Sequence, residues 1–411
     1  MPGTWLILAD DLSGAADAGV AFARRGLTTE VRWDNPRAAA PGPDVIAFDT
    51  DSRRLDAAAA AARQRAAAQA LWSPGASLYK KIDSTLRGQP AAEIAALAQS
   101  TQATRVIFAP ANPAMGRTTR AGRVWVRDRP LEDSETWRRE HTYESADLAD
   151  ALATSGLAAV KLPLELVRAP DRLADALRAP RAPGTVLVCD AERDADLAAI
   201  AAAAQDAHGT LFAGSAGLAQ ALAAQLAPRR FAPLDVRPTR AGMLLVVGSL
   251  ASISREAAAR VAAMPGVRAM RVNSGALLDA DARERLRFGA AVATALAAGD
   301  DVLVDIAPEP APDLARGPAL ARALAQCLEP ARHALGGLVV TGGETASALL
   351  AGWYFHGIRL IEEVAPGISL GIAVGEGRVP TVTKPGGFGD ASSLVLALEA
   401  LRRLKQGNVS G

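Results

Sequence analysis

The sequence has little cysteine, histidine and aromatic content, and its positive and negative charges nearly cancel. Its two cysteines, Cys189 and Cys327, lie far apart and have no histidine or cysteine nearby at metal-site spacing, so we expect neither a disulfide framework nor a zinc site. A formal net charge of +1 gives no basic field for nucleic acid or for an anionic membrane. No apolar run reaches the roughly 18 residues that a transmembrane helix needs. We therefore expect a cytoplasmic protein with no nucleic-acid and no membrane partner.

Short apolar runs alternate with alanine-rich segments of helical character, which is the pattern of an α/β fold with mostly parallel sheets. The chain has 411 residues, and at roughly 150 residues per domain this suggests two α/β domains with a ligand cleft between them. Residues 228–240 are rich in proline and arginine without periodicity, so we expect a linker there, between domains 1–227 and 241–411. Residues 110–119 are too rich in proline, glycine and arginine to continue regular structure.

Polar clusters follow the expected strands of the first half at their carboxyl ends. Asp10 and Asp11 come directly after the run 5–9. The densest cluster follows the run 76–79 and contains Lys81, Asp83, Ser84, Thr85 and Arg87. Ligands of open α/β sheets bind at this edge, and such cations, carboxylates and hydroxyls suit a polyhydroxy acid. A simpler interpretation is helix capping by Asp83 or Ser84 beside a solvated lysine and arginine.

Glycine-rich turns follow the expected strands of the second half. Gly248 and Ser249 follow the run 243–247, residues 341–346 read Thr-Gly-Gly-Glu-Thr-Ala, and residues 384–390 read Lys-Pro-Gly-Gly-Phe-Gly-Asp. Glycine lets a phosphate approach the backbone, and the first turn of a helix binds anions through its free N–H groups. These turns therefore indicate a site for the phosphates of a nucleotide.

Several well-known nucleotide motifs are missing from the sequence. It contains no GxxxxGK[ST] loop and no protein-kinase set of catalytic-loop and magnesium motifs. No GxGxxG opens a helix after the first strand of either half, which disfavours a dinucleotide-dependent dehydrogenase. A polyhydroxy acid in one half and phosphates in the other suggest phosphoryl transfer, which depends on positioning and charge neutralisation. The sequence therefore favours a kinase of a different fold.

The ordered motifs resemble those of the four-carbon acid sugar kinases, over nearly the whole chain. The matching segments are residues 9–15, with Ser13 where the family usually has threonine, and residues 81–88, 110–119, 189–191, 214–219, 248–249, 341–346, 366–367 and 383–389. The resemblance implies a sugar-acid-binding first domain and an ATP-binding second domain. It also implies ATP-dependent, Mg²⁺-assisted phosphorylation of the terminal hydroxyl of an acid such as D-threonate, D-erythronate or 3-oxo-tetronate.

Carried over position by position, the resemblance also implies the site residues. Catalysis would fall to Asp11 and Asp83. The substrate site would contain Asp10, Lys81, Ser84, Thr85 and Arg87. The ATP site would contain Ser249, Ser254, Gly342, Gly343, Glu344, Thr345, Gly386 and Gly387. The sequence departs from the family at Ala251 and Ala257, where serine and glutamine are common, while Ser254 replaces a threonine and keeps a hydroxyl.

Several roles stay open between these residues. Either Lys81 or Arg87 pairs with the substrate carboxylate, and either Asp11 or Asp83 accepts a proton from the attacking hydroxyl or orients it. Asp10 is also a candidate ligand of Mg²⁺, which usually takes one or two protein carboxylates. The alternative function is a regulatory protein that binds a sugar acid without catalysis. A homodimer is the default expectation for such an enzyme.

Overall fold

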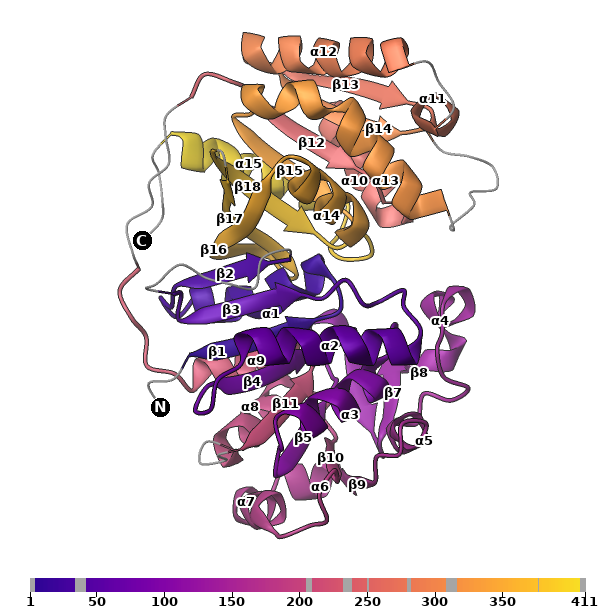
Figure 1. The fold of residues 1–411 in the computed structure, drawn as a ribbon, viewed down its shortest axis with the longest axis vertical. Coiled ribbons are helices and arrows are strands. Elements are labelled where there is room, and N and C mark those ends of the chain that lie inside the picture. The colour runs from indigo at the N-terminus through magenta and orange to yellow at the C-terminus, as the bar shows by residue number, and fades with distance from the viewer. Residues whose placement is uncertain are drawn as a thin grey trace. The chain divides into compact units, whose positions relative to one another are not determined.

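The computed structural model describes residues 4–33, 42–204, 209–231, 239–249, 251–278, 282–307, 316–375 and 377–406. The chain folds into two compact units, one of residues 1–31 and 35–230 and the other of residues 32–34 and 231–411. Of the expected linker, 228–240, residues 232–238 lie outside the described part. Both units consist of a sheet with helices on its two faces, as the alternating pattern predicted (Figure 1).

The first unit contains a sheet with the strand order β2-β3-β1-β4-β11-β5-β10-β9, and the pairings from β3 to β9 are parallel. Its central strands are short, continuous apolar runs, because a parallel sheet is covered on both faces. The strands are β1 (Trp5–Ala9), β2 (Thr29–Arg32), β3 (Val45–Asp49), β4 (Ser77–Lys81), β5 (Arg105–Ala109), β9 (Ala159–Leu162), β10 (Val186–Cys189) and β11 (Thr210–Gly214).

The two faces of this sheet carry different helices. Trp5 of β1 packs on Phe22 of α1, with ring centroids 4.9 Å apart, whereas Leu6 and Leu8 point to the opposite face and join a core with α2 and α3. The helices are α1 (Leu12–Ala23), α2 (Ala57–Leu71), α3 (Pro90–Ser100), α4 (Glu135–Arg139), α5 (Leu148–Ala153), α6 (Leu164–Val167), α7 (Pro170–Arg178), α8 (Asp194–Ala203) and α9 (Ala216–Ala224), with 3₁₀ turns at Pro113–Met115 and Leu131–Asp133.

A small antiparallel sheet follows β5, in the order β6 (Arg117–Arg120), β7 (Arg123–Val126) and β8 (Arg129–Pro130). The expectation that residues 110–119 lack regular structure is therefore wrong for its last three residues. The buried Asp190 holds this hairpin, because its Oδ1 accepts a hydrogen bond of 2.9 Å from the N–H of Gly122 in the β6–β7 turn. The matching segment 189–191 thus has a structural role at Asp190.

The second unit contains a sheet with the order β13-β14-β12-β15-β18-β17-β16. The pairings from β13 to β18 are parallel, and those of β18 with β17 and of β17 with β16 are antiparallel. The strands are β12 (Met243–Val247), β13 (Val267–Val272), β14 (Asp301–Ile306), β15 (Gly337–Thr341), β16 (Phe355–Ala365), β17 (Ile368–Gly375) and β18 (Arg378–Lys384).

Helices α10 and α15 share one core with the β12, β15 and β18 strands of this unit, through residues such as Val261, Val339 and Leu398. Helices α13 and α14 pack against each other (Figure 1). The helices are α10 (Ser252–Ala262), α11 (Ser274–Leu278), α12 (Ala282–Ala298), α13 (Gly317–Cys327), α14 (Gly343–Gly352) and α15 (Ser393–Lys405), with a 3₁₀ turn at Glu329–Ala334.

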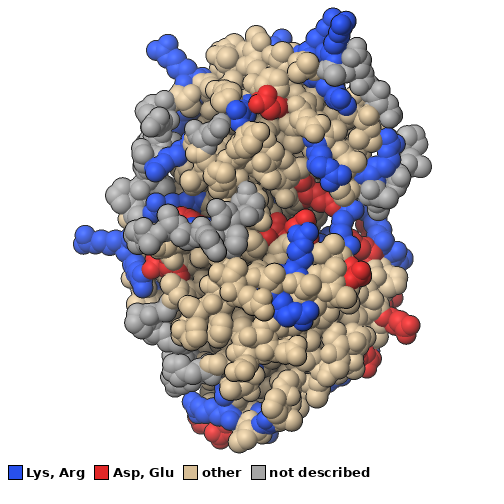
Figure 2. All heavy atoms as spheres, viewed as in Figure 1, with Lys and Arg blue, Asp and Glu red and all other residues tan. Residues whose placement is uncertain are grey.

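The face drawn in Figure 2 carries interspersed acidic and basic side chains, as expected for a net charge of +1. In the described part of the chain, no helix combines the length and the apolar character that crossing a membrane requires.

Candidate active-site residues

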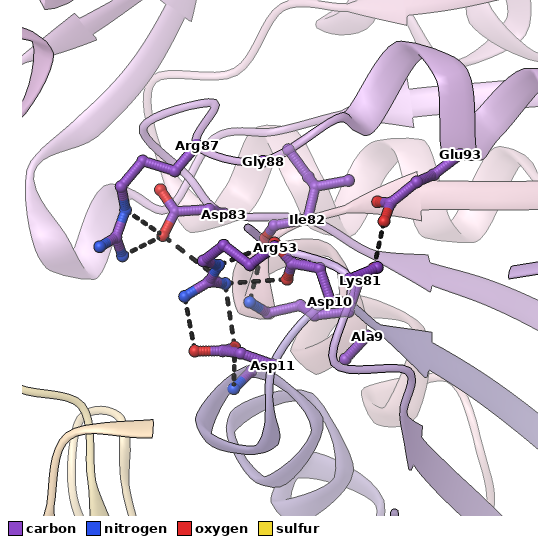
Figure 3. Close-up of polar contacts among 12 residues, drawn as sticks. Ala9, Asp10, Asp11, Arg53, Lys81, Ile82, Asp83, Arg87, Gly88 and Glu93 are labelled. Atoms are coloured by element: carbon purple, nitrogen blue, oxygen red, sulfur yellow. Dashed lines mark hydrogen bonds and ion pairs between the residues drawn. The ribbon is translucent and has the colours of Figure 1, made fainter. Parts of the chain in front are cut away.

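Arg53 is the centre of the polar cluster in the first unit (Figure 3). Its guanidinium donates to both oxygens of Asp10, at 2.8 Å each, and to both oxygens of Asp11, at 2.5 and 2.9 Å. It also lies 3.9 Å from Asp83 Oδ2. The strand order β3-β1-β4 explains the meeting, because Arg53 follows β3, Asp10 and Asp11 follow β1, and Asp83 follows β4.

The backbone fixes Arg53 in this position. The N–H groups of Ser52 and Arg53 both donate to the carbonyl oxygen of Asp10, at 3.1 Å. Asp11 is the N-cap of α1, and its Oδ1 accepts from the N–H of Gly14 at 2.8 Å. A Cβ at Gly14 would lie 2.6 Å from Asp11 Oδ1, so this close approach needs glycine.

Asp10 is buried but remains ionised. Burial acts to raise the pKa of Asp10, but Arg53, Lys80 and Lys81 outweigh it and hold the pKa below its usual value. Burial acts to lower the pKa of Arg53, but the carboxylates of Asp10, Asp11 and Asp83 raise it well above its ordinary range. The contact between Asp10 and Arg53 is therefore a pair of opposite charges rather than a contact of a neutral acid.

Asp83 lies in a tight loop after β4. Its Oδ1 accepts from the N–H of Thr85 at 2.8 Å and from the Thr85 hydroxyl, and its Oδ2 accepts from Arg87. Burial acts to raise the pKa of Asp83, but Arg87 and Arg53 lower it well below its usual value. Asp83 thus has almost no oxygen left for a substrate, which makes it an anchor of the cluster.

The loop after Asp83 is held in an uncommon backbone conformation. Leu86 is buried and has φ +59°, a value that is rare for a residue other than glycine. Gly88 has φ +79°, and a Cβ there would lie 2.9 Å from Asp10 Oδ2. Such strain is retained where the surroundings fix the chain, and it is common around functional sites.

The two candidate cations differ in their surroundings. Lys81 is buried, donates to the carbonyl of Ile82 at 3.0 Å and lies 3.9 Å from Asp17 of α1. Arg87 keeps 30% of its side chain exposed and lies 4.0 Å from Glu140. Both predicted substrate hydroxyl residues, Ser84 and Thr85, are buried in the same loop. Arg87 is therefore the cation of the pair that is open to a ligand.

A buried polar network supports the cluster from the side of α2 and α3. Lys80 pairs with Glu93 at 2.9 Å, and both side chains are excluded from solvent. Glu93 also accepts from the Ser52 hydroxyl and from Gln64, whose amide donates to the Thr50 hydroxyl at 2.8 Å. The network holds residues 50–52 and hence the start of the loop that presents Arg53.

Asp49 lies at the end of β3 beside the cluster, and it is buried. Burial first, and the carboxylates of Asp11, Asp51 and Asp10, raise the pKa of Asp49 well above its usual value. Asp49 differs in this from Asp10 and Asp83, whose pKa values are lowered.

The surroundings of Asp10 do not fit the expected Mg²⁺ ligand. Both of its oxygens accept hydrogen bonds from Arg53. Among the described residues there is no group of three His, Cys, Asp or Glu side chains that could hold a metal ion. Cys189 and Cys327 are buried free thiols.

In the second unit, the three glycine-rich turns meet at the carboxyl ends of β12, β15 and β18. A Cβ at Gly386 would lie 2.3 Å from Ser249 Oγ, and one at Gly248 would lie 1.9 Å from Thr345 Oγ1. The N–H of Gly342, a residue with φ +91°, donates to the carbonyl of Lys384 at 2.9 Å. The structure therefore brings together the predicted Ser249, Gly342, Thr345 and Gly386 with the neighbouring Gly343 and Gly387.

Two helices begin at these turns without a side-chain cap. Gly342 is the N-cap of α14 and Ala251 is the N-cap of α10, and neither accepts a hydrogen bond through a side chain. Glu344 lies in the first turn of α14. Ala257 is fully buried in the core between α10 and α15, so alanine at this position packs rather than faces a ligand. A first turn without a side-chain cap is suited to binding an anion through its N–H groups.

Lys384 ends β18 and has no exposed surface. Its Nζ donates to Ser254 Oγ at 3.0 Å, and the Ser254 hydroxyl donates to the carbonyl of Gly386 at 2.8 Å. Burial lowers the pKa of Lys384 to about 8. Ser254, predicted to contact ATP, thus also links the lysine to the glycine turn.

Arg53, Asp49 and Lys384 are functional candidates that were not predicted individually from the sequence. Arg53 and Asp49 lie in the polar segment 49–53 at the end of a strand, which is the signal that identified Asp10 and Asp83. Lys384 opens a glycine-rich turn, and the sequence shows this cation beside the glycines without indicating its role. In each case the sequence gives the residue type and its position at a strand end, but it does not show which strand lies beside it.

Comparison with known proteins identifies both parts of the chain. Residues 5–222 match the family model described as a sugar-binding N-terminal domain, and residues 244–394 match a nucleotide-binding C-terminal domain. The chain is 42% identical to a Cupriavidus necator protein named D-threonate kinase, covering 97% of this chain and 98% of that protein. A protein of the same name from Bordetella bronchiseptica is 35% identical, covering 96% and 97%.

The fold also has a close counterpart among solved structures. A crystal structure from Salmonella typhimurium LT2 superposes with a TM-score of 0.80, covering 96% of this chain and 98% of that chain, at 21% sequence identity. At this identity the likeness concerns the fold alone.

Proposed function

The chain belongs to the four-carbon acid sugar kinases, and we propose that its acceptor is D-threonate, phosphorylated by ATP on the terminal hydroxyl. The observation that carries the choice of acid is that the relatives with 42% and 35% identity are both named D-threonate kinase. D-erythronate and 3-oxo-tetronate differ from it by one stereocentre or one oxidation state. Kinase relatives do not favour the alternative of a binding protein without catalysis.

We assign the substrate carboxylate to Arg87. Its guanidinium is partly exposed, whereas Lys81 is buried against Asp17 and a carbonyl oxygen. A guanidinium that already pairs with Asp83 is held in one orientation, which suits the two oxygens of a carboxylate. Lys81 then contributes charge to the cluster rather than a direct contact.

We assign the terminal hydroxyl to Asp11. Both candidate carboxylates accept hydrogen bonds at both oxygens, but Asp11 keeps 19% of its side chain exposed, whereas Asp83 keeps 9%. The pKa of Asp83, held well below its usual value by Arg87 and Arg53 against burial, also makes it a poor proton acceptor. Asp10 and Asp83 then hold Arg53, and Arg53 orients Asp11.

The second unit would hold ATP through the first turns of α10 and α14 and the turns at Ser249 and Gly386. Free N–H groups at a helix start and close backbone approach at glycine are suited to phosphates. Mg²⁺ would enter on the phosphates of ATP, where it neutralises charge. The domain limits 1–227 and 241–411, with the linker 228–240, are part of this proposal, as are a homodimer and a cytoplasmic location, where ATP is available.

The test is ADP release from ATP and Mg²⁺ with a panel of acids: both enantiomers of threonate and of erythronate, 3-oxo-tetronates, and longer sugar acids as controls. Preferential turnover of D-threonate is the expected result. Preferential turnover of another four-carbon acid would overturn the assigned acceptor. Sugar-acid binding by calorimetry that no acid converts into ADP release would instead favour the binding protein.

A further inference from the structure

Lys384 is a buried cation without an acidic partner in the part of the chain that the structure describes. Its Nζ contacts the Ser254 hydroxyl at 3.0 Å and the carbonyl of Pro385 at 3.3 Å, and it forms no ion pair with any described residue. Lysine is almost never fully buried unless it is paired with an opposite charge. The contrast with Lys80, which pairs with Glu93 at 2.9 Å inside the first unit, shows how this chain otherwise satisfies a buried ammonium.

The Lys384 ammonium also lies at the N-terminal end of α10, where a positive charge is unfavourable. Ser254 belongs to the first turn of α10, so Lys384 adds a positive charge where the helix dipole is already positive. The N-cap of α10, Ala251, contributes no side-chain oxygen that would offset this charge. Two positive groups held together, with no carboxylate of the described residues in ion-pair contact with the lysine, indicate that an anion belongs between them.

A second unsatisfied group lies beside the lysine. Thr341 ends β15 and is paired in register with Lys384 of β18, so that the two side chains point to the same face of the sheet. Thr341 Oγ1 is buried and has no hydrogen-bond partner among the described residues. The next residue, Gly342, is the uncapped start of α14. Thr341, Lys384 and the starts of α10 and α14 therefore lie at the same edge of the sheet, at the carboxyl ends of β15 and β18.

We propose that Lys384 is the phosphate-binding cation of the ATP site, with Thr341 and the first turns of α10 and α14 as its partners. This inference rests on the proposed use of ATP and adds the residue that recognises the phosphates. A bound phosphate supplies the missing counter-charge and favours the protonated lysine. At a pH above the pKa that Lys384 has in the nucleotide-free protein, nucleotide binding is therefore accompanied by the uptake of a proton.

The charged groups around Lys384 are compatible with this coupling. Asp390, in the turn before α15, raises the pKa of Lys384, against the larger effect of burial. Asp390 itself accepts hydrogen bonds from Ser392. The other charged side chains in the first turns of the packed helices are Arg255 in α10, which donates to the carbonyl of Ile306 at 2.7 Å, and Glu344 in α14.

The first experiment compares ADP with adenosine, which lacks phosphates, as calorimetric ligands of the full chain. We expect Lys384→Met to lower the affinity for ADP by about 10- to 100-fold, as for a lost hydrogen bond to a charged group, and to leave adenosine binding unchanged. The exposed Arg403→Gln removes one positive charge from the same unit and should change neither. An equal loss for ADP and adenosine, or no loss for ADP, would overturn the inference.

A second experiment uses the unmodified chain and does not depend on the folding of a variant. ADP binding is measured at about pH 8.5 in two buffers of different ionisation enthalpy, which reports the proton uptake expected for a lysine of lowered pKa. No uptake would contradict the role of Lys384. A chain that binds neither ADP nor ATP would overturn the use of ATP as well, so the two failures are distinguishable.

Discussion

Lys80 Nζ lies 2.9 Å from Glu93 Oε2, and neither side chain is accessible to solvent. The pair joins β4 to α3 next to Asp10 and holds Ser52 through Glu93. We expect Glu93→Ala to lower the free energy of unfolding by about 3–5 kcal/mol, because it leaves an ammonium buried without a counter-charge. Urea unfolding of both proteins measures the difference.

The matched control is the exposed pair of Arg139 and Glu135, which also contains a glutamate. Glu135→Ala should change the free energy of unfolding by less than about 1 kcal/mol, because exposed ion pairs contribute little. Equal losses in the two variants would show that the Lys80–Glu93 pair is not specially important to the fold.

Arg53→Lys tests whether one guanidinium organises the carboxylates. Lysine keeps the charge but cannot donate to Asp10 and Asp11 in the same paired geometry. We expect kcat/KM for the four-carbon acid to fall by about 10- to 100-fold, since hydrogen bonds to charged groups contribute about 1.5–3 kcal/mol. The control is Arg65→Lys on α2, where the arginine is partly exposed and lies outside the cluster. Unchanged kinetics in Arg53→Lys would remove Arg53 from the site.

Asp11→Asn and Asp83→Asn separate the proton acceptor from the anchor. Asp11→Asn should lower kcat by about 10²–10⁴-fold with folding preserved, because general-base catalysis contributes that much. Asp83→Asn should mainly reduce stability and raise KM, since Asp83 fixes Arg87 and Thr85. Steady-state kinetics with thermal unfolding of each variant gives both values. A larger loss of kcat in Asp83→Asn would reverse the two assignments.

Asp83 also gives a pH dependence of stability with a defined sign. Arg87 and Arg53 outweigh burial and hold its folded-state pKa well below the unfolded value of about 3.9. The folded protein therefore binds this proton less readily than the unfolded chain. The stabilisation is complete above about pH 5 and is lost as the pH falls below about 3.9 towards the folded-state pKa.

The free energy of unfolding of the native chain and of Asp83→Asn, measured between about pH 7 and pH 3, tests this sign. The advantage of the native chain should shrink as the pH falls. An advantage that grows on acidification would mean that Asp83 is not held ionised by its arginines.

Much of the fold could be predicted because its signals are local. The predicted strand 5–9 has the same bounds as β1, and Asp10 and Asp11 follow it at the edge where open α/β sheets bind ligands. Arg53 could not be placed in the same way, because its meeting with Asp10 depends on β1 lying between β3 and β4. Strand order is a long-range property that periodicity does not report.

Strands β6, β16 and β17 were not predicted from the sequence, for a different reason. β6 begins at Arg117, directly after a glycine turn, and is stabilised by pairing with β7 rather than by an apolar run. β16 and β17 are long antiparallel partners, and β16 is only partly buried, so it lacks the continuous apolar pattern of the parallel strands. The burial of Lys384 could not be predicted, because it depends on the packing of α10, more than a hundred residues away in the sequence.

Ala251→Ser restores the residue that the family commonly has at the start of α10. Ala251 has the extended backbone of an N-cap, with φ −61° and ψ 134°, but it has no side-chain oxygen. Serine should accept a hydrogen bond from the first turn and raise the free energy of unfolding by about 0.5–2 kcal/mol, as N-caps do. Ala262→Ser at the last residue of the same helix adds the same hydroxyl without capping, so it should not stabilise the protein. Urea unfolding without nucleotide measures both, and equal effects of the two substitutions would show that α10 gains nothing from a cap.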